Sequence, residues 1–196
     1  IVFESKKEDG TIVTEEKEVD DYYKPNNPDE YVIVIVDHAR LIHPENGQDL
    51  WGSIAKLSSD YFVTMRNKWG YIPVLIQQQA ASQENIEHAK FDKLRPTLDG
   101  LGDNKTTQQD ANLILGLFSP IRHKISTYEG YNIQRFKDHI RFLEILGGRE
   151  GGGGIVSPLF FDGAVNFFKE LPLPTEEEKL LKIYGIIENL DNMKKQ

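Results

Sequence analysis

The chain has 196 residues, of which 39% are hydrophobic, enough for one domain with a sizeable core. It has no cysteine, which excludes disulfides and thiolate metal sites and fits a reducing, cytoplasmic setting. The net charge of -8 disfavours nucleic-acid binding, but residues 1–30 alone carry ten acidic side chains against four lysines, and residues 31–174 are nearly neutral. No apolar stretch approaches the roughly 20 residues that span a bilayer, so no membrane partner is expected.

The first 30 residues form an acidic segment of their own. Within it EDGT, residues 8–11, lies between two short apolar stretches and predicts a small hairpin. The chain begins with Ile1 and its only methionines are Met65 and Met193, so we expect a fragment of a longer protein.

The next strong signal is YVIVIV, residues 31–36, which Asp37 follows directly. A short, continuous apolar run rich in β-branched side chains is typical of a strand buried on both faces of a parallel sheet. Open α/β sheets bind ligands at the carboxyl ends of such strands, which makes Asp37 a candidate site residue. Asp37 as a cap for the following segment is the plainer alternative.

A helix and a second strand are predicted next. From Gln48 to Trp69 apolar side chains recur every three or four residues, which indicates one face of a long helix ending at Gly70. Those side chains are Leu50, Ile54, Leu57, Tyr61 and Met65. IPVLI, residues 72–76, predicts a buried strand that again runs into polar residues, the glutamines at 77–79. Residues 80–105 predict a long loop with one short helix near 85–91.

The rest of the chain predicts strands and a final helix. NLILGLF (112–118) and HIRFLEIL (139–146) predict strands, and IVSPLFF (155–161) with VNFF (165–168) predicts a closing hairpin. Residues 122–141 are basic, which a solvated loop and a phosphate-binding loop explain equally well. Residues 175–196 begin with a capping threonine and an acidic turn and predict an amphipathic helix. The five histidines show no i, i+4 pair, so a histidine metal site is not expected.

Residues 31–161 resemble the C-terminal half of the RecA-type ATPase core of DnaB-type replicative DNA helicases. YVIVIVDHARLI resembles their Walker B strand, and IPVLIQQQ resembles the strand that follows it. The stretch RPTLDGLGDNKTTQQDANLILGLF, Arg95–Phe118, is the most specific match, because its RP, L and QDA elements keep the family's spacing. FLEILGGREGGGG resembles the strand and turn that carry a lysine and, two residues later, the arginine finger.

The resemblance implies an α/β fold, the C-terminal portion of a RecA-like P-loop NTPase core. This fold has a mainly parallel sheet flanked by helices, here over residues 31–174, with a closing β-hairpin and a C-terminal helix at 175–196. Phosphoryl transfer from ATP needs a metal held near the phosphates, a polar group at the terminal phosphate and positive charge on the developing oxyanion. By resemblance Asp37 holds Mg²⁺, Gln79 senses the γ-phosphate and Arg149 is the finger that enters a neighbouring subunit.

The resemblance also implies partners. It places Asp103, Asn104 and Lys105 in the loop that binds single-stranded DNA. In the intact protein the implied cofactors are ATP and Mg²⁺. The implied partners are single-stranded DNA, further copies in a hexameric ring, and a primase or loader.

Several positions depart from the family pattern. Gly147 stands at the family's lysine, Gly102 replaces an arginine in the DNA loop, and Lys105 stands where a glycine is usual. The phosphate-binding GxxxxGK[ST] is absent from the chain, and GGREGGGG has no lysine followed by Ser or Thr. We therefore expect this chain alone not to hydrolyse ATP.

Three interpretations remain open. The leading one is a fragment of an ATP-driven DNA helicase. The second is a degenerate RecA-like module that binds DNA or supports assembly without hydrolysis, and the third is a RecA-family recombination or repair ATPase. The plainer interpretation of Arg149 is a surface arginine on a flexible loop, and that of Asn104 is an ordinary turn.

Overall fold

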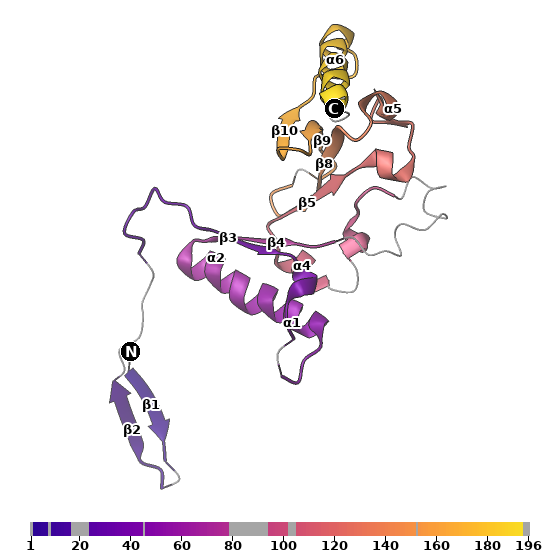
Figure 1. Ribbon diagram of the computed structural model, residues 1–196. Helices are drawn as coiled ribbons and strands as arrows, with labels where there is room; N and C mark the ends of the chain where they lie inside the picture. Colours follow the sequence, from indigo (N-terminus) through magenta and orange to yellow (C-terminus); the bar gives the residue numbers. More distant parts are fainter. Residues whose placement is uncertain are drawn as a thin grey trace.

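The structure is a computed structural model that describes residues 2–7, 9–16, 24–44, 46–78, 94–101, 105–151 and 153–193 (Figure 1). The acidic start folds into an antiparallel hairpin of β1 (Val2–Lys6) and β2 (Ile12–Glu16), which lies apart from the other elements. Gly10 in its turn has a φ of 85°, which glycine adopts at no steric cost. The predicted hairpin is confirmed.

The first half of the body is a parallel pair of strands joined by a long helical segment. β3 (Ile33–Asp37) pairs with β4 (Ile72–Ile76). The connection contains η1 (Ala39–Leu41), then α1 (Leu50–Lys56), η2 (Leu57–Phe62) and α2 (Val63–Trp69), the last three without a break. Parallel strands need a long crossover of this kind. Both predicted strands and the predicted helix are confirmed.

Local chemistry explains where the helical segment begins, turns and ends. Asp49 Oδ1 accepts a hydrogen bond from the Gly52 N–H at 2.7 Å, and Gly70, at a φ of 68°, ends the helix. The middle turn, η2, is π-helical, so its extra residue rotates the side chains relative to a regular α-helix. Ser58 is therefore 4% exposed, and Tyr61, predicted on the buried face, is 46% exposed. The single apolar stripe is wrong at Tyr61.

The second half of the body is a four-stranded sheet in the order β10-β9-β8-β5, with every neighbouring pair antiparallel. Its strands are β5 (Leu113–Phe118), β8 (Ile140–Gly148), β9 (Val156–Asp162) and β10 (Phe167–Glu170). The predicted strands and closing hairpin are confirmed, but the mainly parallel sheet is wrong: among the described strands only β3 and β4 pair in parallel. The turns after β8 and β9 reverse the chain directly, which makes neighbours antiparallel.

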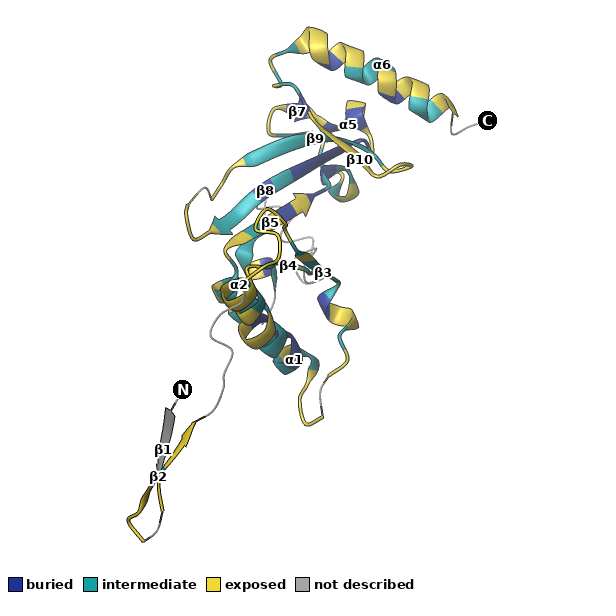
Figure 2. Cartoon of the chain, turned by 90° about the vertical axis from the view of Figure 1, so that its left-hand side faces the viewer, coloured by how far each residue is buried: buried dark blue, intermediate teal, exposed yellow. Residues whose placement is uncertain are grey.

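The main hydrophobic core belongs to this second half. It includes Ile133, Phe136 and Ile140, each 0% exposed, and side chains of the C-terminal helix α6 (Glu177–Met193). Figure 2 shows buried residues gathered on β7, β8 and α5. The predicted final helix is confirmed. Unpredicted elements follow β5: η5 (Pro120–His123), β6 (Thr127–Tyr128), β7 (Tyr131–Asn132) and α5 (Ile133–Phe136). Within the described part of the chain, no helix is long and apolar enough to cross a membrane.

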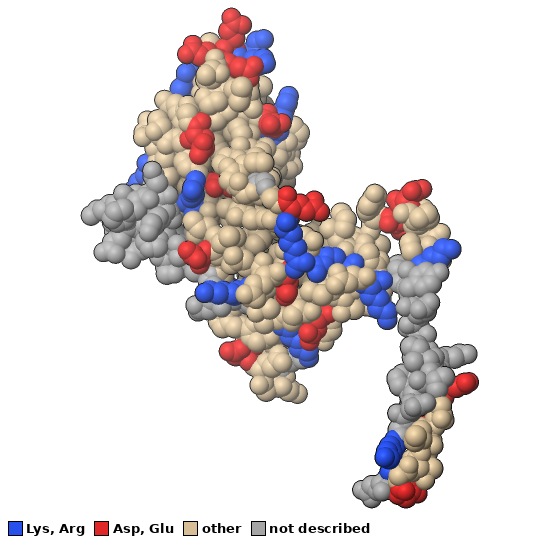
Figure 3. Space-filling view, turned by 180° about the vertical axis from the view of Figure 1, so that it is seen from behind, with Lys and Arg blue, Asp and Glu red and all other residues tan. Residues whose placement is uncertain are grey.

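The basic stretch 122–141 is largely engaged in the fold. The Arg135 guanidinium lies 3.9 Å from the centre of the Tyr184 ring, and Lys137 pairs with a carboxylate of α6. Arg141 is 7% exposed and donates hydrogen bonds to neighbouring carbonyl groups. These three cations stabilise the second half of the body, so they do not form a phosphate-binding loop. Figure 3 shows basic and acidic side chains interspersed on the face it presents.

The parallel pair is covered on one side only. Ile33 and Ile35 of β3 are 58% and 62% exposed, and Leu115 of β5 is 49% exposed. The prediction that residues 31–36 are buried on both faces is therefore wrong, since the described helices pack against one face alone (Figure 2). Among the described strands, β4 pairs only with β3 and β5 only with β8, so each has an open edge.

Candidate functional site

Asp37 is the last residue of β3, at the carboxyl end of the parallel pair and opposite Ile76. Its peptide bond to His38 is cis. His38 caps the following turn, because its Nδ1 accepts a hydrogen bond from the Arg40 N–H at 3.3 Å. The alternative that Asp37 is the cap is therefore wrong. The Asp37 side chain is exposed, and within the described ranges no donor contacts its carboxylate.

This carboxylate suits a metal that also binds substrate. The described residues contain no group of three or more His, Asp or Glu side chains arranged to hold a metal ion by themselves. Mg²⁺ keeps several waters and usually binds through one or two carboxylates together with substrate phosphates. Asp37, a single exposed carboxylate at a strand end, fits the second kind of site.

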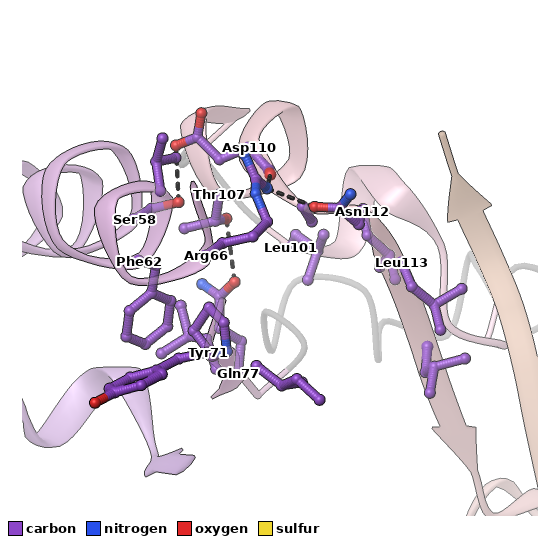
Figure 4. A pocket seen from close by; sticks show the side chains of 17 residues that line it. Ser58, Phe62, Arg66, Tyr71, Gln77, Leu101, Thr107, Asp110, Asn112 and Leu113 are labelled. Atoms are coloured by element: carbon purple, nitrogen blue, oxygen red, sulfur yellow. Dashed lines mark hydrogen bonds between the residues drawn. The ribbon is translucent and has the colours of Figure 1, made fainter. Parts of the chain in front are cut away.

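A pocket of about 360 Å³ lies between the helical segment, β4, α4 (Lys105–Asp110) and β5 (Figure 4). Gln77 is the first residue after β4 and reaches toward α4. Its Oε1 accepts a hydrogen bond from the hydroxyl of Thr107 at 3.2 Å, and Thr107 is 8% exposed. This contact joins the carboxyl end of β4 to the middle of α4.

Three side chains from other elements hold the carboxyl end of α4. The Ser58 hydroxyl donates to Asp110 Oδ2 at 2.8 Å, and Arg66 Nη1 donates to the Asp110 carbonyl at 2.7 Å. Arg149 Nη2 donates to the Gln109 carbonyl at 3.1 Å. The last carbonyls of a helix lack partners within it and attract cations, so two guanidinium groups stabilise this end.

Arg149 itself is exposed, in the turn after β8. Its backbone N–H donates to the Asn112 carbonyl at 3.0 Å, and its side chain rests on Gln109. Lys105, also exposed, begins α4 at the opposite end. The short helix α4 therefore has the predicted finger at one end and a predicted DNA-loop residue at the other.

Half of the predicted site residues can be placed. Gln79, Asp103 and Asn104 lie outside the described residues. Asp37, Lys105 and Arg149 are exposed and lie on elements that the Gln77–Thr107 and Arg149–Gln109 contacts connect. No described contact joins Asp37 directly to Lys105 or Arg149.

Sequence reasoning assigned no role to Thr107 or Arg66, which are central to these contacts. Each bonds with a partner far along the chain: Thr107 with Gln77, and Arg66 with Asn112 Oδ1. Local periodicity does not reveal such pairs. The spacing of RP and QDA was the one available signal that this segment is built in a defined way.

A separate buried polar pair lies in the second half of the body. Glu144 of β8 is 4% exposed and accepts a hydrogen bond from the Tyr128 hydroxyl at 2.6 Å. Burial raises the pKa of Glu144 above its usual 4.5, and burial together with Glu144 raises the pKa of Tyr128. Arg95 of the RP element opposes both shifts, so it lies near this pair. The structure thus connects the RP element to the core.

Comparison with known proteins gives a structural likeness. No family model and no curated protein matches the sequence. The solved structure of the ATPase domain of a DnaB-type helicase is similar to this chain, with a TM-score of 0.60 and 22% sequence identity over 74% of this chain. The chain shares the fold of part of an ATPase domain. It spans less than half of that domain, because the match covers 46% of it.

Proposed function

We propose that this chain is the C-terminal half of the RecA-type ATPase core of a DnaB-type replicative DNA helicase. In the intact protein, a hexameric ring, it couples ATP hydrolysis to movement along single-stranded DNA and to duplex unwinding. Asp37 holds Mg²⁺, Gln79 senses the γ-phosphate and Arg149 acts as the finger for a neighbouring subunit. Residues 103–105 contact DNA.

The observation that carries this proposal is the polar end of the parallel pair. β3 and β4 end side by side, β3 on Asp37 and β4 on the first of three glutamines. A carboxylate without a protein donor is suited to a cation that bridges to phosphate, and a neighbouring amide is suited to a terminal phosphate oxygen. The likeness to a helicase ATPase domain supports the same arrangement at the level of the fold.

The uncovered surfaces support the view that this is half of a core. β4 and β5 have open edges among the described strands, and apolar side chains such as Ile35 and Leu117, 62% and 54% exposed, face away from the helices. Burying apolar surface is favourable by about 25 cal/mol per Å², and open edges offer unpaired hydrogen-bonding groups. The phosphate-loop half of the core would cover them in the intact protein.

Substitution of Asp37 in the intact protein tests the proposal. Asp37→Asn keeps the shape of the side chain and removes the charge that would hold Mg²⁺. Magnesium-dependent ATP hydrolysis should fall by roughly 100-fold or more, since metal stabilisation of the transition state is worth several kcal/mol. Asp29→Asn, in the exposed loop before β3, is the matched control and should hydrolyse ATP as the wild type does. Wild-type hydrolysis by Asp37→Asn would contradict the proposal.

A second candidate function rests on Gly147. No steric reason demands glycine there, because a Cβ at this position would only touch Leu98, at 3.7 Å. The absence of the family's lysine is therefore a chemical difference, which favours a degenerate module that binds single-stranded DNA without hydrolysis. The same ATPase assay separates the two candidates: DNA binding with no hydrolysis by the wild-type intact protein identifies the degenerate module.

A further inference from the structure

Helix α4 contacts every part of the candidate site that the structure describes beyond β3. Lys105 at its amino end continues the candidate DNA loop, Thr107 in its middle bonds to Gln77 at the end of β4, and Gln109 near its carboxyl end receives Arg149. At six residues the helix is roughly 9 Å long, short enough to move as one rigid piece.

We propose that α4 is the element that couples single-stranded DNA binding to ATP hydrolysis, and that Thr107 and Gln77 are its positioning residues. This inference rests on the proposed function and adds to it a specific mechanical connection. Neither residue contacts the reacting atoms. Thr107 acts by holding the end of β4, two residues before Gln79, against the helix that leads from the DNA loop.

The contacts define how the helix can transmit a displacement. Its carboxyl end is anchored to the long helical segment by Ser58 and Arg66, both through Asp110. Its amino end has the exposed Lys105. A pull on the DNA loop therefore turns α4 about the Asp110 anchor, and the turn displaces Thr107 together with Gln77.

The Thr107–Gln77 hydrogen bond is suited to a defined, two-position contact. Thr107 is 8% exposed, and Gln77 is partly buried in the pocket. A polar group in such surroundings is costly to leave without a partner, so the two side chains stay together and move together. Coupling between sites travels through contiguous contacts of this kind.

The experiment measures the ATPase rate of the intact protein with and without an oligothymidine strand. Thr107→Val keeps the side-chain shape and removes the hydroxyl donor. It should leave the DNA-free rate within about twofold and lower the stimulation by DNA by about fivefold or more, the usual size of a coupling between sites. Thr107→Ser restores the donor and should restore the stimulation. Melting temperatures confirm that both variants fold.

Thr106→Val is the matched control, because it makes the same change one residue earlier on the same helix, where the described residues show no side-chain hydrogen bond. It should keep wild-type stimulation. By linkage, a non-hydrolysable ATP analogue should also change the affinity for the oligonucleotide in the wild type and in Thr107→Ser, but not in Thr107→Val.

The outcomes separate the inference from the proposed function. Wild-type stimulation in Thr107→Val, an equal loss in Thr106→Val, or hydrolysis that DNA does not stimulate in the wild type would each overturn the coupling role and leave the ATPase assignment intact. Absence of any magnesium-dependent hydrolysis in the wild type would instead overturn the proposed function, and the inference with it.

Discussion

Arg149→Ala in the intact protein tests the finger role, because its effects on stability and on activity should differ widely. The side chain is exposed and makes one described hydrogen bond, to the Gln109 carbonyl at 3.1 Å. The bond from its backbone N–H to Asn112 survives the substitution. The free energy of unfolding should therefore fall by no more than about 1 kcal/mol, a shift in melting temperature of about 2–4 °C.

ATP hydrolysis should fall far more. Arginine fingers contribute roughly 10³-fold or more to phosphoryl transfer, which corresponds to about 4 kcal/mol of transition-state stabilisation. With Gly147 in place of the family's lysine, no second cation lies two residues earlier to share the charge. Because the finger acts on a neighbouring subunit, mixing Arg149→Ala with a phosphate-loop lysine variant should recover part of the activity in hybrid rings.

Arg122→Ala, an exposed arginine in η5, is the control and should retain full activity. An ATPase rate within a few-fold of wild type for Arg149→Ala would refute the finger role. Arg149 would then be a surface residue that caps the carboxyl end of α4.

Two further predictions concern DNA and pH. Binding of the intact protein to single-stranded DNA should weaken steeply with salt, and Lys105→Ala should reduce the slope of log K against log salt by roughly 0.7, whereas Lys169→Ala on β10 should not; an unchanged slope for Lys105→Ala, measured by fluorescence anisotropy, would remove this residue from the interface. Glu144 has a raised pKa in the folded chain, so the folded state binds the proton more tightly and its contribution to stability falls as pH rises from 4.5 to neutrality. Glu144→Gln removes this titration, and denaturant unfolding should show its stability advantage over wild type growing with pH; a constant difference would contradict the assignment.

The sequence predicted the elements whose signal is local. The helix across residues 50–69 was predictable because its apolar spacing, the Asp49 cap and the Gly70 stop all agree. The strands at 33–37 and 72–76 were predictable from short β-branched runs. The rotation at η2 was not, since nothing in a spacing of three and four indicates a π-helical turn.

Sheet direction and the long-range polar contacts could not be predicted from local patterns. The strand 140–148 has the same apolar character whether its neighbours run parallel or antiparallel, and only the turns decide. Asp37 was predictable as the polar end of a strand. Thr107 was not, because its importance comes from Gln77, thirty positions away in the sequence.

The two halves of the body differ greatly in how much core they possess. Of the buried hydrophobic side chains in the described ranges, only Ala39 and Ile54 belong to the parallel half, and the remainder lie between residues 94 and 187. Local opening is easiest where few apolar contacts hold a segment, so amide hydrogens of β3 should exchange with solvent sooner than those of β8. The strand that carries Asp37 is thus the part of the molecule whose rigidity depends most on what binds to it.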